Sequence, residues 1–145
     1  MEVQFAQKAL IVKDQMILLI QKSADDPYQP LKWEIPGGRL KAGETLDEHI
    51  CREVKEEVGL AIEPGRPLAM WSWTLAKHPG NPRVVAVIRE CALTPDYPEL
   101  INFAGHEADD HIRAWQWVLL AEVTNYDLIP NARQPILTAL QLLST

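Results

Sequence analysis

The sequence has few cysteines and no long apolar run, and each shortage excludes a class of protein. Its two cysteines, Cys51 and Cys91, lack the density of a disulfide scaffold and the spacing of a CxxC zinc site. The longest apolar runs, such as residues 16–20 and 84–88, hold five residues, whereas a membrane-spanning helix needs about 20. The first residues carry charges and lack the apolar core of a secretory signal. We therefore expect a cytoplasmic protein without a membrane span.

An excess of basic residues is also absent. Lys and Arg total 14 against 20 Asp and Glu, which gives a net charge of −6 and a pI near 5.2. This balance gives no excess of positive charge with which to bind a nucleic-acid polymer or an anionic membrane. A small phosphate ester can still enter an acidic site when a divalent cation accompanies it. We expect a small-molecule partner and a chain that is a monomer or a homodimer.

The pattern of apolar segments predicts an α/β (α+β) fold. Apolar residues make up 47% of the chain and charged residues 23%, which suits one globular domain over residues 1–145. Strands are expected at residues 9–12, 16–20, 31–35, 68–75, 83–91 and 112–119, with a Pro-Gly-Gly turn at 36–38 and a loop at 94–110. Helices are expected at residues 46–58 and 132–143. Strands mixed with two helices favour a layered sandwich.

The helix at residues 46–58 has clear boundary signals. Thr45 and Glu48 have the spacing of a capping box, and Gly59 stands where a C′ glycine belongs. Apolar residues recur every four positions from Leu46 onward, which predicts one buried stripe along the helix. The helix is therefore expected to pack against the sheet along this stripe.

Three carboxylates lie on one side of this helix. Glu53, Glu56 and Glu57 occupy positions i, i+3 and i+4, so their side chains project about one turn apart and repel one another. A hard divalent cation such as Mg²⁺, which prefers oxygen ligands, would offset that repulsion. The alternative is an ordinary exposed face on which Arg52 pairs with Glu56 at i+4. The residues around the helix favour the first interpretation.

These residues resemble the Nudix box, G-x5-E-x7-R-E-U-x-E-E-x-G-U, in which U is aliphatic. Residues 38–60 match the box at every specified position, and the preceding Trp-Glu-Ile-Pro-Gly at 33–37 resembles its usual lead-in. The resemblance implies an α/β/α sandwich with a mixed sheet, the box helix on one side and a C-terminal helix. It also implies a hydrolase that cleaves a nucleoside diphosphate linked to another group, using Mg²⁺ or Mn²⁺ and a water nucleophile.

The resemblance assigns roles to the matching positions. The metal ligands it implies are the Gly38 carbonyl and the side chains of Glu53, Glu56 and Glu57. It implies that Arg52 orients these carboxylates and that Glu44 supports them from outside the ligand set. Glu44, Arg52, Glu56 and Glu57 are therefore the expected catalytic residues.

The general base is left open between two places. It is either Glu56 or Glu57 within the box, or an acidic residue on a later loop. That loop offers Glu107, Asp109 and Asp110. A solvated acidic loop is the alternative interpretation of these three residues.

Substrate contacts are expected close to the box. Arg39 and Lys22 are candidates for phosphate oxygens, and Trp73 is a candidate for stacking a nucleobase. Exposure to solvent is the alternative for the two cations, and core packing is the alternative for the tryptophan. His49, on the helix, is expected to be exposed.

The substrate class follows from weaker signals. Relatives that act on ADP-ribose commonly carry a proline 15–16 residues beyond the box, where this sequence has Leu75 and Ala76. We therefore expect nucleoside triphosphates or a related small nucleotide, with ADP-ribose, dinucleoside polyphosphates and sugar nucleotides as alternatives. A non-catalytic nucleotide-sensing module is the alternative from another class. The complete set of box carboxylates argues against it.

Overall fold

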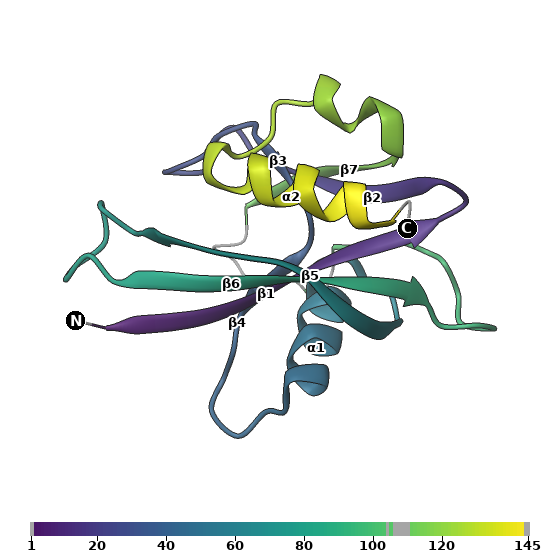
Figure 1. Cartoon of the computed structure of the whole chain (residues 1–145), viewed down its shortest axis with the longest axis horizontal. Coiled ribbons are helices and arrows are strands. Elements are labelled where there is room, and N and C mark those ends of the chain that lie inside the picture. The colour runs from purple at the N-terminus through teal and green to yellow at the C-terminus, as the bar shows by residue number, and fades with distance from the viewer. Residues whose placement is uncertain (1, 104, 106–110, 144–145) are drawn as a thin grey trace.

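Two helices cover opposite faces of a mixed β-sheet (Figure 1). The computed structural model describes residues 2–103, 105 and 111–143. The strands are β1 (Val3–Lys13), β2 (Met16–Lys22), β3 (Trp33–Glu34), β4 (Gly37–Arg39), β5 (Ile62–Thr74), β6 (Arg83–Leu93) and β7 (Ile112–Leu119). The helices are α1 (Leu46–Val58), the 3-10 helix η1 (Leu120–Asn125) and α2 (Pro130–Leu143). No helix within these described ranges is long and apolar enough to cross a bilayer.

The sheet combines parallel and antiparallel pairs. Its order is β3-β2-β1-β6-β5, with β4 added beside β1 and β7 beside β2. β1 and β6 run parallel, while β1 pairs antiparallel with both β2 and β4. The pairing of β1 with β2 is confined to the residues beside their turn, and β4 joins β1 further back, at residues 6–8. The predicted mixed sheet between two helices is confirmed.

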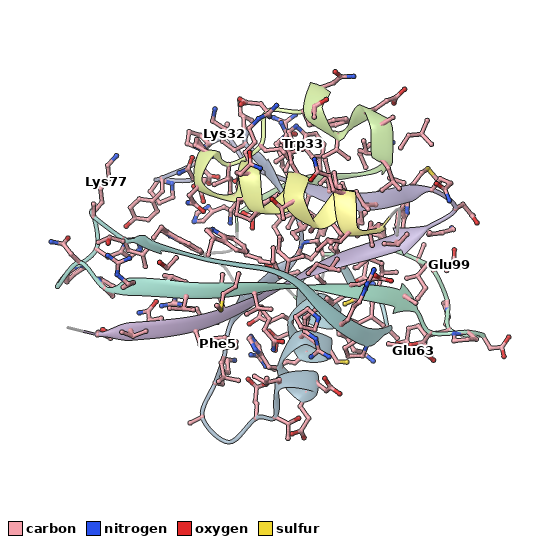
Figure 2. The ribbon with its side chains drawn as sticks, in the orientation of Figure 1. Phe5, Lys32, Trp33, Glu63, Lys77 and Glu99 are labelled. Atoms are coloured by element: carbon pink, nitrogen blue, oxygen red, sulfur yellow. The ribbon has the colours of Figure 1, made fainter. Side chains whose placement is uncertain are left out.

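The core has two parts because successive side chains of a strand point to opposite faces of the sheet. Leu10 of β1 faces α2 and packs with Ile136, whereas Ile11 faces α1 and packs with Ile50 and Val54. Figure 2 shows the same division, with Phe5 on the side of α1 and Trp33 on the side of α2. Each large side chain that is fully buried in this way stabilises the fold by about 1.5–3 kcal/mol. The two layers of core thus fix both helices to the sheet.

The ends of α1 are as the sequence predicts. Thr45 Oγ1 accepts from the Glu48 backbone N–H over 3.1 Å, and Glu48 Oε1 accepts from the Thr45 N–H over 2.9 Å. Gly59 has φ of 76°, in the left-handed region that favours glycine, and its N–H closes the last turn. The predicted stripe is wrong at its first member, since Leu46 lies at the helix start and is 51% exposed.

Several element boundaries differ from the prediction. The strand expected at 68–75 begins six residues earlier, at Ile62, and includes Pro64 and Pro67. Proline is tolerated there because β5 is an edge strand, and the pairing with β6 shifts register at both prolines. The turn expected at 36–38 is wrong at Gly37 and Gly38, which belong to β4, and the strand expected at 31–35 is reduced to β3.

Candidate functional site

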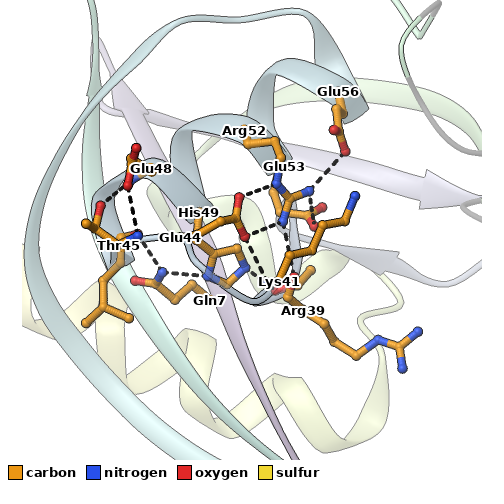
Figure 3. Close-up of polar contacts among 12 residues, drawn as sticks. Gln7, Arg39, Lys41, Glu44, Thr45, Glu48, His49, Arg52, Glu53 and Glu56 are labelled. Carbon is orange, nitrogen blue, oxygen red and sulfur yellow. Dashed lines mark hydrogen bonds and ion pairs between the residues drawn. The ribbon is translucent and has the colours of Figure 1, made fainter.

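Arg52 gathers three carboxylates at the surface of α1 (Figure 3). Its Nε and Nη2 donate to the two oxygens of Glu44, while Nη1 donates to Glu53 Oε1 over 2.9 Å and to Glu56 Oε2 over 3.1 Å. The hydrogen bonds from Arg52 hold the pKa of Glu44 at about 2. The Arg52–Glu56 pair is the i,i+4 contact of the alternative interpretation, but the same guanidinium also joins the other two acids.

Glu53 lies directly against the backbone of Gly38. A Cβ atom added to Gly38 would stand 2.5 Å from Glu53 Oε2, so any side chain at this position would displace the carboxylate. Burial raises the pKa of Glu53, and the adjacent Arg52 partly offsets that shift. The glycine is therefore needed for the close approach of β4 and α1.

Glu57 ties the helix to the neighbouring residue of the same strand. It is 6% exposed, and its Oε1 accepts from the Gly37 N–H over 2.8 Å. Gly37 itself has φ of 151°, and a Cβ added there would meet the Gln7 carbonyl at 2.1 Å. The two glycines thus let one strand contact both Glu53 and Glu57.

The donors around Gly38 fit a hard divalent cation in chemical kind. The Gly38 carbonyl, Glu53, Glu56 and Glu57 offer only oxygen atoms, which Mg²⁺ and Mn²⁺ prefer. In the part of the chain that the structure describes, no three acidic, histidine or cysteine side chains already converge as a metal cluster. Arg52 and the Gly37 N–H hold the carboxylates in the arrangement observed.

His49 is buried, and the prediction that it is exposed was wrong. It is 0% exposed, its Nδ1 lies 2.8 Å from Gln7 Nε2, and its Nε2 lies 2.9 Å from the Gly38 carbonyl oxygen. Burial lowers the pKa of His49, which favours the neutral ring. The prediction failed because this position of α1 faces β1 and β4, which supply polar partners that helix periodicity does not reveal.

A partly buried ion pair between Lys8 and Glu34 was not predicted either. Lys8 Nζ donates to Glu34 Oε1 over 2.7 Å, and Lys22 Nζ stands 3.9 Å from Glu34 Oε2. Burial would lower the pKa of Lys8, but Glu34, Glu57 and Glu53 together raise it. The signal in the sequence is the polar Gln7-Lys8 pair, which stands between apolar residues on both sides.

A cavity of about 750 Å³ opens beside these groups. All three predicted substrate contacts, Lys22, Arg39 and Trp73, line it together with Lys8 and Gly38. Arg39 also donates to Gln4 across the β1–β4 pair, over 3.0 Å. Cations from separate segments of the chain therefore meet at one opening.

Aromatic side chains form another part of the cavity wall. Trp71 and Trp73 stack with ring centroids 5.6 Å apart, and Trp71 Nε1 donates to Asn131 Oδ1 over 3.2 Å. Tyr28 and His78 stack at 4.5 Å and bring the loop after β2 against the turn between β5 and β6. The cavity thus offers flat apolar surfaces near its cations.

The three candidates for a general base on the later loop are Glu107, Asp109 and Asp110. They lie outside the described residues. The choice between them and the box carboxylates therefore stays a prediction.

Comparisons with known proteins agree with the predicted resemblance. The NUDIX domain family matches residues 5–140. The 8-oxo-dGTP diphosphatase of Escherichia coli K12 is 30% identical over 77 residues, which cover 45% of this chain and 60% of that protein. The putative ADP-ribose pyrophosphatase YjhB of Bacillus subtilis is 28% identical over 102 residues, 70% of this chain and 47% of that one. The chain thus spans about half of these curated relatives.

The fold is similar to that of a solved structure over its whole length. The solution structure of the E. coli ORF135 protein has a TM-score of 0.74 and 25% identity, and the match covers 100% of this chain and 93% of that one. Together with the family match, this confirms the resemblance that residues 38–60 predicted.

Proposed function

Because the chain belongs to the NUDIX domain family, we propose that it is a nucleotide pyrophosphohydrolase that uses Mg²⁺ or Mn²⁺ and water. The observation that carries this proposal is the position of Gly38, which lies against Glu53 and also lines the cavity with its cations and tryptophans. Gly38 therefore joins the carboxylates of α1 to the opening that the predicted substrate contacts line. The cytoplasmic location and the monomeric or homodimeric state stay predictions.

The proposed roles follow from the contacts. Glu53, Glu56 and Glu57 would hold the divalent cation, which neutralises phosphate charge and aligns the attacking water when bound. The Gly38 carbonyl already contacts His49 and pairs with Gln7 of β1. Arg52, anchored by Glu44, keeps Glu53 and Glu56 in place. The side chain of Glu56 is 32% exposed, against 13% for Glu53, so water reaches it more easily. Within the box we propose Glu56 as the general base in preference to Glu57, which is 6% exposed; Glu107, Asp109 and Asp110 stay the alternative.

Phosphate groups are assigned to the cationic part of the cavity. Lys22 and Arg39 line it, and their ammonium and guanidinium groups donate charge-assisted hydrogen bonds to anionic oxygens. Trp73 presents its ring to the same space, where a base can stack whatever its hydrogen-bonding pattern.

Asn131 gives the cavity a preference among bases. Trp71 Nε1 can only donate, so the oxygen of the Asn131 amide faces it, and Nδ2 is left to donate elsewhere. Asn131 is one of the residues that line the cavity, and an amide N–H donor there would favour a base with a carbonyl acceptor, such as O6 of guanine, over one with an amino group. We therefore propose nucleoside triphosphates with an oxopurine base as substrates. The B. subtilis relative makes ADP-ribose the second candidate.

The test is a panel of substrates with matched variants. With Mg²⁺, the protein should hydrolyse dGTP or 8-oxo-dGTP faster than dATP, ADP-ribose, dinucleoside polyphosphates and sugar nucleotides. Glu57→Gln should lower kcat by orders of magnitude while the fold is kept. Glu63→Gln, at the opposite end of the sheet from Lys77 of the cavity wall (Figure 2), should leave kcat unchanged.

Each result has a distinct meaning. Absence of metal-dependent hydrolysis over the whole panel would contradict the proposed enzyme. Tight nucleotide binding in calorimetry without hydrolysis would favour the sensing module. Preferential hydrolysis of ADP-ribose would keep the enzyme class and overturn the assignment of the base preference to Asn131.

A further inference from the structure

The outer edge of β5 offers backbone groups to a further strand. β5 stands at the end of the strand order, so one of its edges pairs with β6 and the other faces outward. Leu75 N–H donates to the Pro82 carbonyl over 2.9 Å, and hydrogen-bonded pairs of an antiparallel ladder recur at every second residue. The other residues of this part of β5 that bond to β6 are therefore Ala69, Trp71 and Trp73. The backbone N–H and C=O groups of Met70, Ser72 and Thr74 point away from the sheet.

This edge is open in the part of the chain that the structure describes. Among the described residues, none donates to or accepts from the outward backbone groups of Met70, Ser72 and Thr74. The side chains of these three residues are exposed, that of Met70 to 73%. Figure 1 shows α2 above the sheet and α1 below it, so neither helix lies beyond β5 in the plane of the sheet.

The sequence protects only the first half of the edge. Pro64 and Pro67 lie there, together with the charged side chains of Glu63 and Arg66, and both kinds of residue hinder pairing with another strand. Residues 68–75 have neither a charge nor a proline, and they include two tryptophans and a threonine, which favour strands. Natural proteins usually block an exposed edge by such means. An edge that lacks them indicates that another strand pairs there.

The outward groups are complementary to those of a second copy of the chain. Ser72 lies midway between Met70 and Thr74, so two antiparallel copies of β5 can pair with Ser72 opposite Ser72 and Met70 opposite Thr74. Each outward N–H then meets an outward C=O of the other copy, and all three residues are paired on both edges or faces of the ladder. The contact is the same seen from either copy, as twofold symmetry requires.

This register also brings the cavity walls of the two copies together. Trp71 and Trp73 are half-buried on the other face of β5, where they line the cavity. With Ser72 at the centre, Trp71 of each copy lies opposite Trp73 of the other, in a pair without backbone hydrogen bonds, where side chains come closest. Aromatic pairs on neighbouring strands attract each other. A second copy therefore adds contacts to Met70 on one face and to the tryptophans on the other.

We propose that the protein is a homodimer in which β5 pairs antiparallel with β5 of a second copy, centred on Ser72. The two sheets then continue into each other across the twofold axis. This inference goes beyond the proposed function and does not depend on it, because the contact involves the edge of the sheet and not the carboxylates of α1.

Hydrogen exchange of single amides tests the contact. Sedimentation velocity of the wild type should show a monomer that converts to a dimer as the protein concentration rises. Where about nine-tenths of the chains are dimeric, the amides of Met70, Ser72 and Thr74 should exchange about 10-fold more slowly than in the dilute monomer, because exchange then proceeds through the remaining monomer. The amides of Trp71 and Trp73 are the internal control. They bond to β6 in both states, so their exchange should not change in this way.

Charged variants test which side chains face each other. Met70→Glu should raise the Kd of the dimer about 10-fold, because it replaces an apolar contact by a charge at two places in each dimer. Met70→Glu/Thr74→Lys should restore most of the affinity, since opposite charges then face each other across the twofold axis. Gln116→Glu, on the exposed part of β7, is the matched control and should dimerise like the wild type.

A proline tests the backbone in place of the side chains. Ser72→Pro removes an N–H that points outward, so the ladder with β6 keeps its hydrogen bonds and the fold should be retained. The Kd of the dimer should rise at least about 10-fold, because both hydrogen bonds of the central pair are lost.

The outcomes decide between this contact and others. A wild type that stays monomeric at the concentrations used for nuclear magnetic resonance would overturn the proposal. A dimer that is equally tight in Met70→Glu and Ser72→Pro, or whose outward amides exchange as fast as in the monomer, would place the contact elsewhere. A double variant that stays as weak as Met70→Glu would overturn the register centred on Ser72. None of these measurements uses a nucleotide, so failure of the proposed hydrolase would leave their result unchanged.

Discussion

The Lys8–Glu34 ion pair should be the strongest electrostatic contact near the cavity. The two side chains are 18% and 9% exposed, and 2.7 Å separates Lys8 Nζ from Glu34 Oε1. At this distance two unit charges attract by about 6 kcal/mol at an effective dielectric constant of about 20. Desolvation of both groups cancels much of that energy. Removing one partner nevertheless leaves the other charge without its counter-ion, which typically costs about 3–5 kcal/mol.

We therefore expect Glu34→Met to lower the free energy of unfolding by about 3 kcal/mol, the lower end of that range. The lower end applies because Glu57 and Glu53 still attract Lys8. In a chain of this size the melting temperature should fall by about 6–12 °C. Because an apolar pair often replaces a buried ion pair at little cost, Lys8→Met/Glu34→Met should recover most of the loss. Urea denaturation of the wild type, Lys8→Met, Glu34→Met and the double variant measures the coupling.

The effect has a defined pH window. Burial would raise the pKa of Glu34, but Lys8 and Lys22 lower it, so its contribution is present above the ordinary glutamate pKa of 4.5 and is lost as the pH falls. The pKa of Lys8 is raised, so its contribution is present below 10.5 and is lost as the pH rises above that value. The cost of Glu34→Met should be largest between these limits. The reasoning would be refuted if the double variant lost as much unfolding free energy as the two single variants together, within about 0.5 kcal/mol.

Two further predictions concern the box. Gly38→Ala should reduce kcat at least about 100-fold, because the new Cβ would displace the Glu53 carboxylate, which lies 2.5 Å from it. The control is Gly43→Ala, where a Cβ meets nothing within 4 Å; it should keep kcat and lose only about 1 kcal/mol of stability because of the positive φ. Equal kcat in the two variants would contradict the packing argument. Hydrogen bonds from Arg52 lower the pKa of Glu44 to about 2. The ionised Glu44 carboxylate should therefore stabilise the fold above pH 4.5, and this contribution should vanish as the pH falls toward 2. Melting curves of wild type and Glu44→Gln should therefore converge at low pH, and a constant difference would exclude this linkage.

Local signals carried most of what the sequence predicted. The limits of α1 follow from Thr45, Glu48 and Gly59, because capping bonds join residues three or four positions apart. The resemblance to the Nudix box placed Gly38 and the acids of α1 in one region. The layered sandwich followed from the mixture of strands and helices, and the mixed sheet followed from the resemblance to the Nudix box, although strand ends such as that of β1 were missed.

Long-range contacts account for what was missed. His49 depends on Gln7, 42 positions away, and Glu34 on Lys8, 26 positions away. Gln7 and Lys8 pair with β4, which lies in the chain between β3, the strand of Glu34, and α1, the helix of His49. Periodicity along α1 indicates which face is apolar, but it does not reveal which polar groups a distant strand brings to that face. Buried polar residues were therefore the hardest part of the site to predict.

The partners of the box carboxylates predict how the fold responds to metal removal. Glu53 and Glu56 are bonded to Arg52, and Glu57 is bonded to the Gly37 N–H, so the repulsion that suggested a cation is already offset within the protein. We expect the chain to stay folded in EDTA. Mg²⁺ at about 100 times its Kd should then add about 2.7 kcal/mol of stability by mass action, or about 5–11 °C in melting temperature. Glu57→Gln, with one ligand charge fewer, should show a smaller shift. A far-ultraviolet circular dichroism spectrum of an unfolded chain in EDTA would instead mean that Arg52 does not replace the cation, and that the metal is part of the fold.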